Sequence, residues 1–190
     1  GAAVLTLPNF LTLLRIIAVP IFLILISYER FGPALVLFLA AAVTDTIDGV
    51  LARLTDSKSD LGAALDPLAD KLLVVSAFVS LTLLGVLPVW LFIIVVTRDA
   101  VILGGYLALY FVSTAPELRP SQISKVNTFF EMMTIGLALA TETRPDIAIG
   151  PIFAAAWYAT GTTAAMSGIH YVYTGLLWYQ RQGERPAPPH

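Results

Sequence analysis

Six long apolar runs dominate the sequence, and they restrict the chain to a bundle of helices. The runs lie at about 9–28, 33–54, 61–86, 88–113, 122–141 and 147–180, and each is near or above the roughly 20 residues that a helix needs to cross a hydrocarbon layer. Breaker-rich or charged segments separate them, for example the one from Glu29 to Pro33. The sequence therefore predicts an all-α protein, an integral membrane bundle of six transmembrane helices.

The composition supports a membrane protein and excludes several other classes. Hydrophobic residues make up 57%, charged residues only 13%, and the mean hydropathy is +0.82, whereas soluble domains are about 25% charged. We expect one transmembrane domain over residues 1–180 and a disordered, proline-rich tail over 181–190. The net charge of -2 provides no basic surface for nucleic acid. The absence of cysteine excludes disulfides and thiolate metal sites.

Positive residues are divided unevenly between the two sides of such a bundle. One side carries six in its connections and tail and the other side two: Arg53, Lys58, Arg119, Lys125, Arg181 and Arg185 against Arg30 and Arg144. Because positive residues are retained on the side of synthesis, this bias predicts both termini in the cytoplasm, or in the matrix for a mitochondrial inner membrane.

Four aspartates interrupt the second and third apolar runs on that same positive side. Asp45 and Asp48 share one helix face, and Asp66 and Asp70 share another, because each pair is three or four residues apart. The short connection makes the two helices antiparallel neighbours. Carboxylates in a low dielectric must be neutralised by protons or cations. Oxygen ligands without His or Cys favour Mg²⁺, Mn²⁺ or Ca²⁺, and two such ions about 3.5–4 Å apart suit displacement at phosphorus.

Small residues and one arginine accompany the aspartates. Gly49, Ala52 and Gly62 leave space for a nucleotide, and Arg53 can bind a pyrophosphate through two parallel hydrogen bonds. Two other interpretations stay open. The aspartates can be structural hydrogen-bond partners, or they can form the relay of a carboxylate-based proton or cation transporter. Transporters place such sites near the middle of the membrane, whereas these carboxylates lie toward one face, which favours an enzyme.

A motif of eight residues carries a resemblance to a known family. Its spacing is Asp45-x2-Asp48-Gly49-x2-Ala52-Arg53-x8-Gly62-x3-Asp66-x3-Asp70. This motif resembles the signature of the CDP-alcohol phosphatidyltransferases, and the segment from Asn9 to Arg15 with Pro20 is similar to the start of that family. The resemblance implies six transmembrane helices, usually a homodimer, and transfer of a phosphatidyl group from a CDP-linked lipid to an alcohol with release of CMP.

The resemblance also assigns roles to the motif residues. It implies that Asp45, Asp48 and Asp66 bind two Mg²⁺ or Mn²⁺ ions. Asp70 would lie at the same metal site and accept the proton of the acceptor hydroxyl. The CDP-lipid site would then be formed by Gly49, Ala52, Arg53 and Gly62, with the arginine on the pyrophosphate.

Three short stretches bear on the identity of the acceptor. Thr97-Arg98-Asp99, Arg119-Pro120-Ser121 and the segment from Ile123 to Thr128 resemble the CMP-forming cardiolipin synthases of bacteria and mitochondria. That resemblance implies phosphatidylglycerol as acceptor and cardiolipin as product, with Arg98, Lys125 and Arg119 on the acceptor's phosphate. The alternative within the family is a phosphatidylglycerophosphate synthase, which uses glycerol 3-phosphate. Glu131 departs from the pattern, because both kinds of synthase often carry Gln there.

Overall fold

Six helices make up the described part of the chain, which is residues 7–55, 60–112, 122–146 and 149–183 of the computed structural model. In chain order they are α1 (Leu7–Ser27), α2 (Phe31–Thr55), α3 (Asp60–Leu83), α4 (Val89–Val112), α5 (Gln122–Thr143) and α6 (Gly150–Gly183). These described ranges contain no strand. The all-α prediction is confirmed, and each helix begins and ends within a few residues of a predicted apolar run.

The helices belong to two compact units. The first consists of Gly1–Pro88 and Met132–Phe153, and the second of Val89–Glu131 and Ala154–His190. Helices α5 and α6 contribute to both units, since the division falls within each of them. Whether residues 1–180 form one transmembrane domain stays a prediction.

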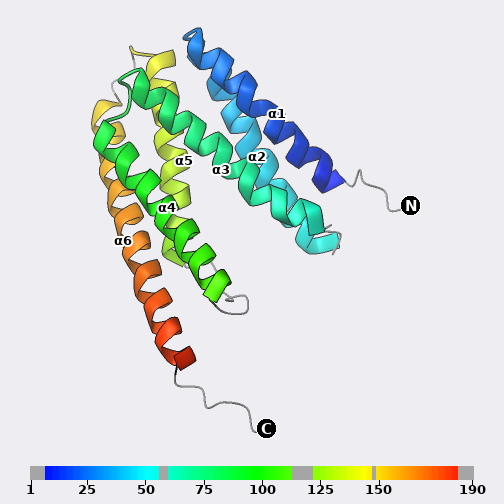
Figure 1. Ribbon diagram of the computed structural model, residues 1–190. Helices are drawn as coiled ribbons and strands as arrows, with labels where there is room; N and C mark the ends of the chain where they lie inside the picture. The colour runs from blue at the N-terminus through cyan, green and yellow to red at the C-terminus, as the bar shows by residue number, and fades with distance from the viewer. Residues whose placement is uncertain (1–6, 56–59, 113–121, 147–148, 184–190) are drawn as a thin grey trace, which may run out of the picture. The chain divides into compact units, whose positions relative to one another are not determined.

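The first unit is built around α1, which packs against α2 and α3 (Figure 1). Phe22 of α1 and Phe38 of α2 are fully buried, and their ring centroids are 6.4 Å apart with the rings tilted. Such tilted aromatic pairs add to the free energy that burial of their area contributes. Further buried side chains come from α3 and from the second half of α5: Leu73, Val74, Ala77, Phe78, Leu81, Ile135, Ala138 and Leu139.

Two helices of this unit end in the same hydrogen-bonding motif. After α1, Arg30 N donates to Leu25 O and Glu29 N to Ile26 O, and Glu29 has a φ of 53°. After α3, Val86 N donates to Leu81 O and Gly85 N to Thr82 O, and Gly85 has a φ of 75°. This pattern is the Schellman motif, which uses the last carbonyl groups of a helix and needs one residue in the left-handed region. A glycine meets that need at the end of α3, but a glutamate occupies the position after α1.

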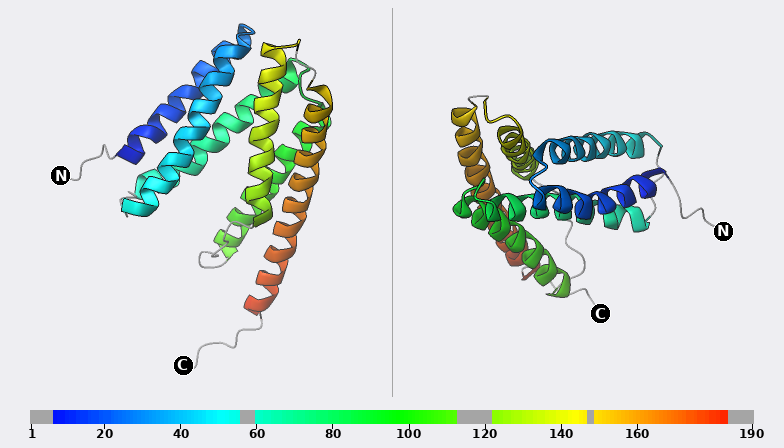
Figure 2. Two further views of the ribbon diagram at one scale, coloured as in Figure 1. Left: turned by 180° about the vertical axis from the view of Figure 1, so that it is seen from behind. Right: turned by 90° about the horizontal axis from the view of Figure 1, so that it is seen from above.

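The second unit contains α4, the first part of α5 and most of α6, and Figure 2 shows α4 (green) beside α6 (orange). Glycines of α6 lie where α4 comes closest. A Cβ atom at Gly161 would be 2.8 Å from Trp90 Cζ3, and one at Gly168 would be 3.7 Å from Arg98 Cγ. Because both positions advance together along the two helices, α4 and α6 run parallel. The Trp90 ring also stacks on Tyr158, with centroids 5.7 Å apart.

Membrane embedding is not confirmed by the helices. Across their described residues, none of them combines the length and the apolar character that a membrane span requires. Helix α6 continues to Gly183, three residues into the segment for which we predict a disordered tail. Residues 184–190 lie outside the described part of the chain.

Candidate functional site

The motif residues lie on two successive helices of the first unit. Helix α2 carries Asp45, Asp48, Gly49, Ala52 and Arg53, and helix α3 carries Gly62, Asp66 and Asp70. The residues of each aspartate pair are three or four positions apart along one helix, which is the spacing at which two residues share a face. The side chains of all eight residues are outside the described set. The gathering of the four carboxylates stays a prediction.

The three residues predicted to bind the acceptor's phosphate differ in burial, and one of them lies outside the described residues. Arg98 lies in α4 and is only 5% exposed, whereas Lys125 lies in the first turns of α5 with an exposed side chain. Arg119 falls in the stretch from 113 to 121, outside the described residues. Among the described side chains, no three or more His, Cys, Asp or Glu residues are grouped as metal ligands would be. That finding does not extend to the four aspartates of the motif.

Arg98 is held by groups from all three helices of the second unit. Its Nη1 donates to Asp99 Oδ1 at 2.7 Å on α4 itself. Its Nη2 donates to Ser124 Oγ on α5. Both Nε and Nη2 donate to Ser167 Oγ on α6, at 3.2 and 3.1 Å. All three guanidinium nitrogens therefore have partners, and the plane of the guanidinium group is fixed.

The electrostatic balance around Arg98 follows from these contacts. Removing a guanidinium from water costs free energy unless an anion and hydrogen-bond acceptors replace the water. Asp99, 17% exposed, supplies the anion, and the two serine hydroxyls supply the acceptors. A phosphate that binds Arg98 must therefore compete with a carboxylate that already balances its charge.

Polar side chains form a seam between α5 and α6, on the N-terminal side of Ser167 along α6. Thr163 Oγ1 donates to Asn127 Oδ1 at 3.0 Å, and Thr160 Oγ1 donates to the carbonyl oxygen of Phe130 at 3.0 Å. Asn127 Nδ2 in turn donates to Glu131 Oε1 at 2.6 Å. Each step of three residues along α5 is matched by a step of three or four back along α6, which is the register of two antiparallel helices. Asn127, Glu131 and Thr160 are completely buried.

Sequence reasoning missed several residues of this region. Ser124, Ser167 and Asp99 position Arg98. Asp99 and Ser124 fall within the stretches singled out around Arg98 and Lys125, but nothing in the sequence indicates this role, and Ser167 lies in neither stretch. Ser167 is separated from Arg98 by 69 residues. The available signal is a hydroxyl residue recurring along one face of an apolar helix, as Thr160, Thr163 and Ser167 do on α6. That pattern marks a face that packs on protein, but it does not identify the partner helix.

Comparisons with known proteins agree on one family. A profile described as CDP-alcohol phosphatidyltransferase matches residues 5–168. A probable cardiolipin synthase (CMP-forming) of Drosophila melanogaster is 35% identical over 185 residues, which cover 89% of this chain and 57% of that protein. The chain therefore spans little more than half the length of that relative.

Two bacterial relatives are covered more fully. A probable phosphatidylglycerophosphate synthase of Mycobacterium tuberculosis is 34% identical over 182 residues, 92% of this chain and 84% of that protein. A cardiolipin synthase (CMP-forming) of Streptomyces coelicolor is 34% identical over 190 residues, 92% of this chain and 81% of that protein. The names of these relatives differ in the product, which is cardiolipin for two of them and phosphatidylglycerophosphate for the third.

Proposed function

Because this chain belongs to the CDP-alcohol phosphatidyltransferase family, we propose that it transfers the phosphatidyl group of CDP-diacylglycerol to phosphatidylglycerol, forming cardiolipin and CMP. The observation that carries the proposal is the complete aspartate motif on two successive helices, α2 and α3. The choice of acceptor is supported by the stretches around Arg98 and Lys125 and by relatives named cardiolipin synthase (CMP-forming).

The donor set fits two hard divalent cations. Asp45, Asp48, Asp66 and Asp70 offer carboxylate oxygens only, which is the chemistry that Mg²⁺ and Mn²⁺ prefer, and no His or Cys interrupts the set. We infer that these four side chains hold both ions. When bound, the ions would stabilise negative charge on the attacking and departing oxygens.

The remaining steps are assigned to residues of the chain. Arg53 would bind the pyrophosphate of CDP-diacylglycerol, and the small residues Gly49, Ala52 and Gly62 would leave space for the nucleotide. Asp70 would accept the proton from the acceptor hydroxyl while that oxygen forms a bond to the phosphorus that carries the diacylglycerol. The bond from this phosphorus to the bridging oxygen breaks, and CMP leaves with that oxygen.

Arg98 and Lys125 would hold the phosphate of the acceptor, with Arg119 as a third contact. The support for Arg98 is its fixed position, since a guanidinium already oriented by Ser124 and Ser167 loses little freedom when it binds an anion. Lys125 follows Ser124 directly in the chain, so its backbone lies beside the same contact.

We further propose that the protein is a homodimer embedded in a bacterial or mitochondrial inner membrane. Many large apolar side chains are exposed in the described part of the chain, Leu83 at 82%, Ile169 at 71% and Val36 at 68% among them. Lipid chains would cover such surfaces without the free-energy cost of exposure to water. The charge bias of the connections supports termini and active site on the cytoplasmic or matrix side.

Two acceptors offered separately test the proposal. Purified protein is given CDP-diacylglycerol with either phosphatidylglycerol or glycerol 3-phosphate, and CMP release and the lipid product are measured. We expect CMP and cardiolipin with phosphatidylglycerol. Turnover with glycerol 3-phosphate alone would instead identify a phosphatidylglycerophosphate synthase, the second candidate, which the name of the Mycobacterium tuberculosis relative favours.

A further inference from the structure

A groove between α4 and α6 extends from Arg98 along apolar side chains that have no role in the reaction described so far. Its volume is about 690 Å³, within the range of small-molecule sites. Aliphatic side chains from both helices form its walls: Ile93, Ile94 and Val101 on α4, and Ile169, Val172 and Leu176 on α6. All of these residues belong to the second unit.

We propose that this α4–α6 groove binds one acyl chain of the acceptor phospholipid while Arg98 binds its phosphate. The inference rests on the proposed function and extends it, because it gives the acceptor lipid a chain-binding site. On α6 the lining runs from Ala164 to Leu176, a length of about 18 Å at 1.5 Å per residue. The groove is therefore elongated along the helices, as an extended hydrocarbon chain requires.

The charge of Arg98 favours an anionic lipid as the occupant. Arg98 is the single charged residue among the described residues that line the groove. A phosphodiester carries one negative charge, as the Asp99 carboxylate does, so charge alone does not favour the phosphodiester over the carboxylate that already contacts the guanidinium. Van der Waals contacts between an acyl chain and the apolar walls of the groove add to the phosphate contact and favour the lipid. A free phosphate compound such as glycerol 3-phosphate lacks this contribution.

Small residues keep the groove open. Ala164, Ala165 and Gly168 are among its lining residues on α6. A Cβ atom at Gly168 would approach Arg98 Cγ to only 3.7 Å, which is ordinary contact, so the glycine is not needed for packing at that point. Larger side chains at exposed positions of this face would occupy the groove without disturbing the buried side of α6.

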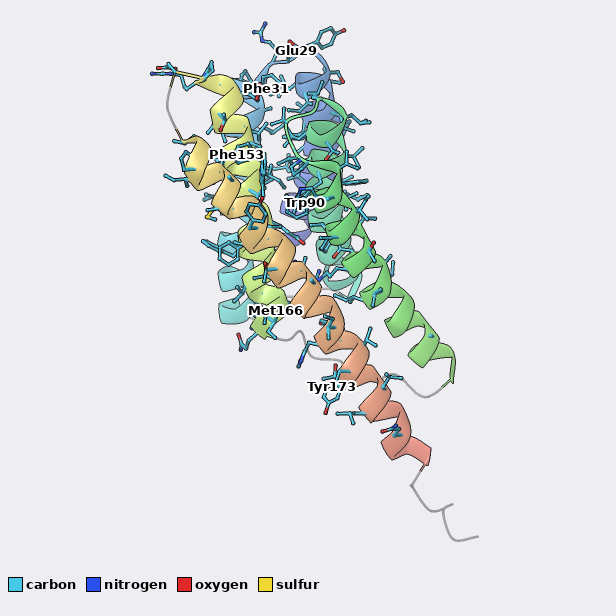
Figure 3. All side chains as sticks on the ribbon, turned by 90° about the vertical axis from the view of Figure 1, so that its left-hand side faces the viewer. Glu29, Phe31, Trp90, Phe153, Met166 and Tyr173 are labelled. Carbon is cyan, nitrogen blue, oxygen red and sulfur yellow. The ribbon has the colours of Figure 1, made fainter. Side chains whose placement is uncertain are left out.

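Figure 3 labels Tyr173, which lines the groove, and Met166, which does not, about two turns apart on α6. Tyr173 is 61% exposed and Val172 is 48% exposed. Substitutions here therefore act on the groove itself rather than on the core.

The experiment compares chain lengths of the acceptor. Ala165→Phe and Val172→Trp are designed to fill the groove. Ala155→Phe is the matched control, since Ala155 is also an exposed alanine of α6 and does not line the groove.

CMP release is measured with dioleoyl and with dihexanoyl phosphatidylglycerol. We expect the filled variants to raise KM for the long-chain acceptor about tenfold or more, because several methylene groups lose their contacts. KM for the short-chain acceptor and the behaviour of Ala155→Phe should stay near those of the unchanged protein.

Equal KM values for the long-chain acceptor in filled and unfilled proteins would overturn the inference, and so would equal losses for both chain lengths. A second measurement does not depend on turnover. Phosphatidylglycerol with a photoreactive diazirine near the end of one chain is irradiated with the protein, and labelled peptides are identified. We expect labels in α4 and α6 at the groove, and fewer labels in Ala165→Phe.

The labelling also separates the two proposals. Groove labelling in a protein that releases no CMP with phosphatidylglycerol would refute the proposed function and leave the lipid site standing. Labelling by a CDP-diacylglycerol analogue in preference to the phosphatidylglycerol analogue would assign the groove to the donor and overturn the inference. Labels spread evenly over other helices would also overturn it, because they indicate general contact with lipid.

Discussion

Arg98 of α4 and Ser167 of α6 are joined by two hydrogen bonds, from Nε at 3.2 Å and from Nη2 at 3.1 Å, although 69 residues separate them in the chain. One hydroxyl oxygen thus accepts from both nitrogens on one edge of the guanidinium group. Together with Ser124 and Asp99, this contact fixes the direction in which the positive charge points.

Ser167→Ala should weaken binding of the acceptor more than it slows turnover. Hydrogen bonds to charged groups contribute about 1.5–3 kcal/mol, so loss of this oriented acceptor should raise KM for phosphatidylglycerol about tenfold. The split between KM and kcat is the readout, and kcat should change less than KM. Ser80→Ala is the control, because its hydroxyl donates only within α3, to Ser76 O at 2.7 Å. A fall in kcat as large as the rise in KM would argue for a purely structural effect. The same conclusion would follow if Ser80→Ala caused the same changes.

Asp70→Asn should separate binding from chemistry. The amide keeps the size of the side chain but cannot accept the hydroxyl proton, so turnover should fall at least about 10²-fold. Binding of CDP-diacylglycerol, measured by calorimetry in detergent, should persist because Asp45, Asp48 and Asp66 are unchanged. A variant with normal turnover would remove Asp70 from the role of base.

Chelation of divalent ions should abolish CMP release, and Mg²⁺ or Mn²⁺ should restore it. A strong polydentate chelator in excess should remove ions that the protein holds only through carboxylate oxygens and water. Asp48→Asn should then require a higher Mg²⁺ concentration for half-maximal activity than the unchanged protein does. Full activity after exhaustive chelation would refute the divalent-ion proposal.

Gly161→Ala and Gly168→Ala should change stability in opposite directions. Alanine in place of glycine stabilises a helix interior by about 1 kcal/mol, and this gain applies at both positions. At Gly161 the new methyl group would lie 2.8 Å from the Trp90 ring and displace it from Tyr158. Overpacking of this kind costs about 1–3 kcal/mol, which exceeds the gain.

The melting temperature of each variant in detergent measures the outcome. We expect it to fall for Gly161→Ala and to rise for Gly168→Ala, where the nearest atom is 3.7 Å away. In a Trp90→Leu background the loss at Gly161 should disappear. Persistence of the loss without the indole ring would show that another contact causes it.

The two Schellman motifs allow a second test of stability. Gly85→Ala should destabilise by about 1–2 kcal/mol, because an L-residue in the left-handed region clashes with its own carbonyl group. No atom lies within 4 Å of the added Cβ, so the whole effect is that of the backbone. Glu29→Gly should do the reverse, since Glu29 already has a φ of 53°. A fall in melting temperature for Glu29→Gly would contradict this account.

The bounds of the helices could be predicted from the sequence because each apolar run is long and ends at residues that disfavour a helix. The predicted run at 122–141 corresponds to α5 at Gln122–Thr143, and the run at 33–54 to α2 at Phe31–Thr55. Glycine, proline and charge between the runs leave few other places for a helix to end. The prediction at the end of α3 extended to residue 86, whereas the helix stops at Leu83 because Gly85 terminates it.

The contacts around Arg98 could not be predicted in the same way. Periodicity shows which residues share a face of one helix, but it does not say which other helix that face meets or in what register. Ser167 lies among small residues of α6 that would suit packing on any neighbour. Resemblance to the family predicts that Arg98 binds the acceptor's phosphate. Only the structure shows that the Asp99 carboxylate contacts the same guanidinium and would compete with that phosphate.

The antiparallel seam between α5 and α6 links places that are far apart. Thr160 and Ser167 are seven residues apart, about 10 Å along the axis of α6. If α6 were to slide by one turn, the bonds at Thr160, Thr163 and Ser167 would break together rather than in succession. A substitution at Thr160, the distant end of this seam, should therefore shift the guanidinium of Arg98, so that a residue outside the proposed acceptor site can still change the proposed choice of acceptor.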